Sequence, residues 1–103
     1  MPRTQNPVDL AMHVAGQHFG VTVTDIRSQR RSRTVHTART WGMYLAAAST
    51  GASFEEIGKR FGGRDHTIVR AVARGRAREV ADNPASAELF ESLSMKFSLV
   101  PHA

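Results

Sequence analysis

The chain has 103 residues, of which 41% are hydrophobic, and it carries a formal net charge of +5 with a sequence pI near 11.1. This length suits a single domain over residues 1–103 with one modest core, and no run of about 18 apolar residues is available to span a membrane. There are no cysteines for disulfides or thiolate metal sites, and the N-terminus lacks the apolar core of a signal peptide, so we expect a cytoplasmic protein.

The first two predicted elements are helices. Asn6-Pro7 indicates an N-cap followed by proline at the first helical position, and Gly20 indicates a C-terminal stop. The apolar side chains between them recur at helical spacing: Val8, Met12, Ala15 and Phe19. The alternating VTVT of residues 21–24 is too short and isolated for a sheet, so we expect a turn and a short helix over residues 24–27.

The stretch SQRRSRT, residues 28–34, is predicted to be a basic loop. It lies in the part of the chain where positive charge is concentrated. Residues 26–80 carry twelve lysines and arginines against four acids, a balance of +8, whereas residues 1–25 and 81–103 have balances of −1 and −2. Such a concentration is typical of a nucleic-acid binder, although a solvated basic face would have the same composition.

A longer helix is predicted through TARTWGMYLAAAS, residues 37–49, with Gly51 as its stop. Its inward stripe is expected to be Ala38, Trp41, Leu45 and Ala48. Gly42 weakens this helix by about 1 kcal/mol relative to alanine unless a close packing contact compensates.

Three more helices follow. Ser53 and Glu56 form a capping box for a short helix that ends at Gly62-Gly63. Asp65 can cap the next helix, and Asn83-Pro84 can open a last one. An apolar ladder at four-residue spacing marks that last helix: Leu89, Leu93 and Phe97. Strand signals are nearly absent, so the predicted fold is all-α with about six helices.

Four hydrogen-bonding side chains stand together where the fifth of these helices begins: Arg64, Asp65, His66 and Thr67. Asp65 and His66 are adjacent and would splay apart on a helix, and no motif places a nucleophile near them. No second histidine or acid lies four residues after His66, as a helical metal site requires, and no phosphate-binding loop of the GxxxxGK[ST] type occurs. We therefore expect no enzyme activity, no metal, no nucleotide and no other cofactor.

A short helix, a tight glycine turn and a second helix are typical of a helix-turn-helix. In that motif the first residues of the second helix enter the DNA major groove. The side chains at this position suit base edges, since aspartate accepts from cytosine N4, histidine donates to purine acceptors and the threonine methyl packs on a thymine methyl.

The sequence GGRDHTIV, residues 62–69, resembles the signature of the C-terminal DNA-binding domain of DnaA, the bacterial replication initiator. SQRRSRTV is similar to the basic loop of that domain and SFEEIGKRFGGRDHT to its helix-turn-helix. The resemblance runs from about Val8 to Phe97 and covers the DNA-reading part of the initiator without its ATPase domain. It implies specific binding to a short, asymmetric double-stranded element of the DnaA-box type.

The resemblance also implies residue roles. The base-reading positions are Asp65, His66 and Thr67 in the major groove and Arg31 in the minor groove. The residues assigned to the DNA backbone are Arg30, Arg33, Arg39 and Arg64.

Four positions depart from the family pattern. Ile68 replaces a second threonine and removes a hydroxyl at the groove, while Ala38 replaces a proline. Ala47 replaces a basic residue, which predicts the loss of one phosphate contact. Arg76 stands where an apolar residue is typical, which predicts that its helix ends or packs differently beyond Gly75.

The function predicted from the sequence is specific double-stranded-DNA binding by a monomer on the nucleoid, in regulation of replication initiation or of transcription. Two other readings remain open. One is a non-specific basic nucleic-acid-binding protein. The other is a helical protein-interaction module that uses Leu89, Leu93 and Phe97.

Overall fold

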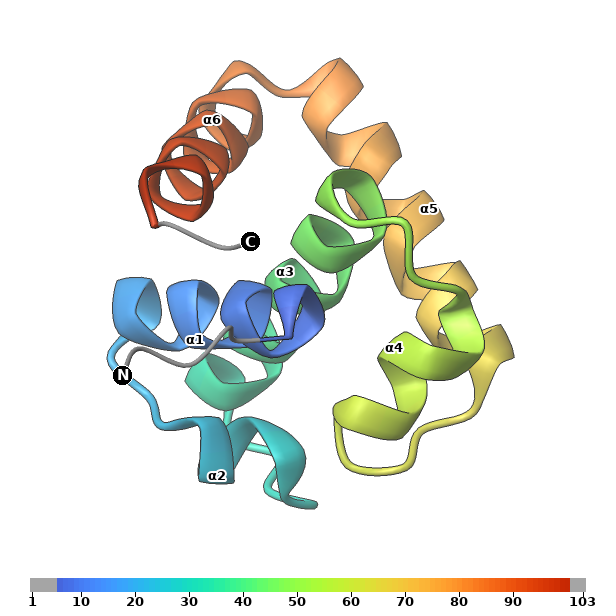
Figure 1. The fold of residues 1–103 in the computed structure, drawn as a ribbon. Coiled ribbons are helices and arrows are strands. Elements are labelled where there is room, and N and C mark those ends of the chain that lie inside the picture. The colour runs from blue at the N-terminus through green and yellow to red at the C-terminus, as the bar shows by residue number, and fades with distance from the viewer. Residues whose placement is uncertain (1–5, 101–103) are drawn as a thin grey trace.

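The computed structural model describes residues 6–100, and within them the predicted all-α fold is confirmed. The helices are α1 (Pro7–Phe19), α2 (Val23–Arg27), α3 (Arg33–Ser49), α4 (Phe54–Arg60), α5 (His66–Asp82) and α6 (Pro84–Leu99) (Figure 1). In the described part of the chain no helix combines the length and the apolar character needed to cross a membrane.

Helix α3 is the centre of the fold and contacts each of the other five helices. Its Trp41 and Leu45 are buried in one core with Phe61 of the helix-turn-helix. Helix α6 returns to this core and closes it with Leu93 and Phe97 (Figure 1). The helix-turn-helix of α4 and α5 is thereby attached to a rigid support.

The predicted caps are formed. The side-chain oxygen of Asn6 accepts from the backbone N–H of Val8 at 2.8 Å, and that of Asn83 accepts from Ala85 at 2.9 Å. Ser53 Oγ accepts from the N–H of Glu56 at 3.1 Å. The Glu56 carboxylate, expected to complete a capping box, lies 3.7 Å from Arg60 Nε instead.

Two predictions about α3 were wrong. The helix begins at Arg33, four residues before the predicted start at residue 37, because Ser32 Oγ accepts from the N–H of Val35 at 3.2 Å and caps the helix inside the basic stretch. Arg33 therefore lies on the first turn of a helix, and only residues 28–32 form the loop. Ala48 was expected on the inward stripe and is exposed, because the buried face of α3 continues from Leu45 through Ala46.

Gly42 has the close contact that its position in a helix requires. A Cβ atom at this residue would lie 3.1 Å from Phe61 Cε2. The missing side chain lets the ring of Phe61 pack on α3, which offsets the low helix propensity of glycine.

Helices α4 and α5 approach closely at the turn that joins them. Gly62 and Gly63 adopt φ values of 93° and 79°, which are disfavoured for residues with side chains. The carbonyl oxygen of Gly58 accepts from the N–H of Arg64 at 2.8 Å, and a Cβ atom on Gly58 would overlap the carbonyl oxygen of Arg64. Three glycines thus set the distance and angle between the two helices.

Helix α5 does not end at Gly75 and continues to Asp82. Arg76, which stands where an apolar residue was expected, lies with its guanidinium 4.5 Å above the ring of Trp41. It also donates to Glu79 Oε1 at 2.8 Å and to Thr40 Oγ1 at 2.8 Å. Its flat cation covers the aromatic ring as an apolar side chain would and joins α5 to α3.

Candidate nucleic-acid interface

The first residues of α5 form an exposed polar surface. Asp65 is the N-cap, and its Oδ1 accepts from the N–H of Thr67 at 2.7 Å and from the Thr67 hydroxyl at 2.5 Å. The side chains of Asp65 and His66 are 58% and 52% exposed, and Ile68 is 51% exposed. The second carboxylate oxygen of Asp65 has no bond within residues 6–100 and is available as an acceptor.

The protonation state of Asp65 follows from its bonds to Thr67. The hydroxyl and then the backbone N–H of Thr67 donate to the carboxylate and lower the pKa of Asp65. The group is therefore ionised at neutral pH and only accepts hydrogen bonds. An ionised acceptor at a helix N-terminus is also stabilised by the helix dipole.

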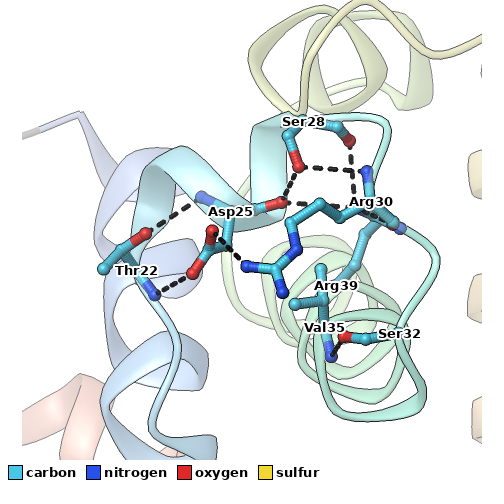
Figure 2. A network of polar contacts seen from close by, with 7 residues as sticks. All are labelled: Thr22, Asp25, Ser28, Arg30, Ser32, Val35 and Arg39. Carbon is cyan, nitrogen blue, oxygen red and sulfur yellow. Dashed lines mark hydrogen bonds and ion pairs between the residues drawn. The ribbon is translucent and has the colours of Figure 1, made fainter.

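The basic loop between α2 and α3 and the first residue of α3 present three exposed arginines. Arg30 Nη1 lies 3.2 Å from Asp25 Oδ1, and its side chain is 62% exposed (Figure 2). Asp25 is in turn held by Thr22, whose backbone N–H and hydroxyl lower the pKa of this aspartate together with Arg30. Arg31 and Arg33 are exposed and contact no acid in the described part of the chain.

Arg39 lies beneath this loop. It is only 6% exposed, and its Nε donates to the carbonyl oxygen of Ile26 at 2.8 Å. Its Nη2 donates to the carbonyl oxygens of Ser28 at 3.0 Å and Arg30 at 3.1 Å. Burial and then the neighbouring charge of Arg64 lower the pKa of Arg39. In the structure Arg39 holds the loop from inside, although it was predicted to contact the DNA backbone.

Arg64 joins the loop to the helix-turn-helix. Its Nη2 donates to the carbonyl oxygen of Ser28 at 2.8 Å, and its Nη1 donates to that of Phe61. Burial lowers the pKa of Arg64. Its side chain is half-buried, so its donors also face the protein backbone more than the solvent. The sequence offers no signal for either arginine's role, because backbone carbonyls carry no sequence signature.

Two hollows meet at Arg64. One, of about 370 Å³, is strongly basic and is lined by Gln29, Arg30, Arg31, His36, Arg39 and Arg64. The other, of about 560 Å³, lies along the helix-turn-helix and is lined by Glu55, Glu56, Lys59, Gly63, Arg64, Asp65 and His66. Asp65 and His66 of the predicted base-reading set and Arg30, Arg31 and Arg39 of the loop region therefore line adjacent hollows that share Arg64. Thr67 and Arg33 line neither hollow.

Comparison with known proteins identifies the family. Residues 8–74 match the model of the bacterial dnaA protein helix-turn-helix. The chain belongs to this DnaA family. The match contains every predicted site residue, from Arg30 in the loop to Thr67 on α5.

Three similar relatives among curated proteins are chromosomal replication initiator proteins DnaA. The one from Xanthobacter autotrophicus is 48% identical over 67 residues, which is 65% of this chain and 13% of the relative. The one from Sphingopyxis alaskensis is 40% identical over 88 residues, or 84% of this chain and 19% of the relative. The one from Caulobacter sp. is 35% identical over 89 residues, which is 86% of this chain and 18% of the relative. The chain thus spans less than a fifth of each of these DnaA proteins.

Proposed function

We propose that this chain binds double-stranded DNA in a sequence-specific manner, at an element of the DnaA-box type. Membership of the DnaA helix-turn-helix family supports DNA binding in general. The observation that carries the specific proposal is the exposed set of Asp65, His66 and Thr67 at the first turn of the second helix of the motif. That is the part of a helix-turn-helix that contacts base edges.

Each of these side chains has a distinct chemistry to offer. The free oxygen of ionised Asp65 accepts a hydrogen from cytosine N4, and His66 donates to a purine acceptor. The Thr67 hydroxyl donates a hydrogen bond to Asp65 Oδ1 at 2.5 Å, which fixes the two side chains relative to each other. The Thr67 methyl group is then available to pack on a thymine methyl. Ile68 adds apolar surface beside them where the family has a hydroxyl.

The arginines in and around the loop divide into those that are exposed and those that bond to backbone carbonyls. Arg31 enters the adjacent minor groove, and Arg30 and Arg33 bind phosphates, since these three are exposed. Arg39 and Arg64 act on DNA through the loop, because their donors are used on the carbonyls of residues 26–30 and 61. They fix the distance between the minor-groove arginine and the start of α5.

The biological role that fits is regulation of replication initiation or of transcription, by a monomer that works on the nucleoid in the cytoplasm without a nucleotide or other cofactor. The burial of two key residues argues against the hypothesis of a helical protein-interaction module. Leu93 is 0% exposed and Phe97 is 5% exposed, so these two side chains of α6 pack in the core of the chain itself.

The experiment that tests the proposal is selection of bound sequences from a random duplex library. We expect enrichment of one short, asymmetric motif resembling a DnaA box. The His66→Ala/Thr67→Ala double variant, selected in parallel, should lose that motif and retain weak binding. If the wild-type chain enriches no motif, the non-specific nucleic-acid-binding reading replaces the proposal.

A further inference from the structure

Helix α5 carries a row of arginines beyond its base-reading start. Arg70, Arg74 and Arg78 follow one another at four-residue spacing and are all exposed. Residues at this spacing lie on one face of a helix, and Thr67 begins the same face. With Thr67, Ala71 and Gly75 they line a surface hollow of about 340 Å³. Figure 1 shows α5 continuing well past α4.

The polar ends of these arginines are not used within the described residues 6–100. None of the three has a hydrogen-bond, ion-pair or aromatic partner among the described residues, in contrast to Arg76, which packs on Trp41 and pairs with Glu79. Like charges four residues apart destabilise a helix. The three arginines form two such pairs, Arg70 with Arg74 and Arg74 with Arg78, and no acid of the described chain pairs with them. This arrangement indicates a negatively charged ligand outside the molecule.

The size and shape of the row fit phosphates of a duplex. With a rise of about 1.5 Å per residue, the three arginines extend over about 12 Å of helix, which is close to the width of the major groove. Ala71 and Gly75 lie between them, and nothing lies within 4 Å of where a Gly75 side chain would begin, so a backbone can approach closely. Guanidinium groups bind phosphate oxygens through two parallel hydrogen bonds.

We propose that Arg70, Arg74 and Arg78 form a second DNA contact, which binds phosphates next to the element that Asp65, His66 and Thr67 read. The contact lengthens the footprint and adds affinity without adding sequence preference. The inference rests on the proposed function for the placement of α5 on the duplex. It goes beyond the family assignment, because the family match ends at residue 74 and leaves Arg78 outside it.

The test compares the wild-type chain with the Arg70→Gln/Arg74→Gln/Arg78→Gln variant on a long duplex over a range of salt concentrations. Each phosphate contact contributes about 0.9 to the slope of log affinity against log salt. We expect the variant's slope to be shallower by up to about 2.7, so that it loses roughly 40-fold less affinity than wild type between 50 and 200 mM salt. Its preference for the selected motif over a random duplex should be unchanged.

Two controls make the result specific. Lys96→Gln on α6 removes the same charge as Arg78→Gln and should leave the slope unchanged, whereas Arg78→Gln should reduce it. The melting temperature of the triple variant should be equal to or above that of wild type, since two like-charge repulsions are removed and glutamine is a good helix former. An unchanged slope in the triple variant overturns the inference, and so does a lowered melting temperature, which would assign the row to the fold.

The experiment distinguishes a failure of the proposed function from a failure of the arginine contact, because sequence preference and salt slope are measured separately. If wild type shows no sequence preference, the specific function is wrong, and the salt slope on a random duplex still reports whether the arginine row binds phosphates.

Discussion

Arg39 and Arg64 donate to the same acceptor, the carbonyl oxygen of Ser28, at 3.0 Å and 2.8 Å. Arg39 comes from α3, below the basic loop, and Arg64 comes from the turn before α5. The loop is therefore held from two sides at Ser28, two residues before its first exposed arginine. Asp65 directly follows Arg64. The Arg64 side chain therefore links the loop proposed for the minor groove to the start of α5, which is proposed for the major groove.

The first prediction concerns this link. Arg64→Lys keeps the charge and loses the forked donors that reach Ser28 and Phe61, so we expect the free energy of unfolding to fall by about 1–3 kcal/mol. Affinity for the selected DNA motif should fall with little change in the salt slope, because no phosphate contact is removed. A double-mutant cycle with Arg31→Ala should show non-additive losses. Additive losses, together with a salt slope reduced by about one unit in the charge-removing variant Arg64→Gln, would restore Arg64 as a phosphate contact.

The second prediction concerns base reading. His66→Ala and Thr67→Ala should each lose about 1–3 kcal/mol of binding free energy on the selected motif and little on a random duplex, as measured by titration of labelled DNA. Thr67→Val is the matched control, because it keeps a methyl group and removes only the hydroxyl that bonds to Asp65. It should lose less than Thr67→Ala. Equal losses on both duplexes would contradict base reading by these residues.

The third prediction separates the loop arginines. Arg30→Ala and Arg33→Ala should weaken binding to selected and random duplexes alike and reduce the salt slope by about one unit each. Arg31→Ala should weaken binding most on duplexes with A·T-rich flanks, where the minor groove is narrow and more negative. Identical losses for Arg31→Ala on A·T-rich and G·C-rich flanks would exclude the minor groove.

The helices could be predicted from the sequence because their signals are local. Asn6, Ser53, Asp65 and Asn83 each bond to a backbone N–H two or three residues away, so the residue type and its position are enough to identify a cap. The start of α3 was missed for a related reason. Ser32 is also a cap, but it stands among arginines whose charge suggested a loop.

The roles of Arg39 and Arg64 could not be predicted from the sequence. Their acceptors are backbone carbonyls at separations of 9 to 13 residues for Arg39 and of 36 residues for the bond from Arg64 to Ser28. Only the folded chain brings these groups together. Position in a family motif assigned both arginines to DNA, whereas burial assigns Arg39 to the interior. For the residues proposed to read bases, by contrast, sequence and structure place the same side chains at one helix start.

The fourth prediction is a dependence of stability on pH through His18. Burial and then the charge of Lys96, whose Nζ lies 3.0 Å from Nδ1 of His18, lower the pKa of this histidine. The folded chain thus binds fewer protons here than the unfolded chain does, so protonation favours unfolding. The contribution is fully present above the ordinary histidine pKa of about 6.5 and is lost as the pH falls from there through the lower pKa of the folded state. Denaturant unfolding at pH 7.5 and pH 5.5 should show a smaller drop in stability for His18→Gln than for wild type. The same drop in both proteins would exclude His18 as the source.

The last prediction compares two helical glycines with opposite surroundings. A Cβ atom at Gly58 of α4 would overlap the carbonyl oxygen of Arg64, whereas at Gly75 of α5 it would meet nothing within 4 Å. Gly58→Ala should therefore lower the free energy of unfolding by about 1–3 kcal/mol, because the turn between α4 and α5 has to move. Gly75→Ala should raise it by about 0.5–1 kcal/mol, since alanine has the higher helix propensity. Urea unfolding gives both values. The turn between α4 and α5 positions Asp65 and the residues after it. Gly58→Ala should therefore also reduce the preference for the selected DNA motif, measured at a temperature where the variant is folded. A stable Gly58→Ala variant with unchanged preference would mean that the close approach of α4 and α5 is not needed for DNA reading.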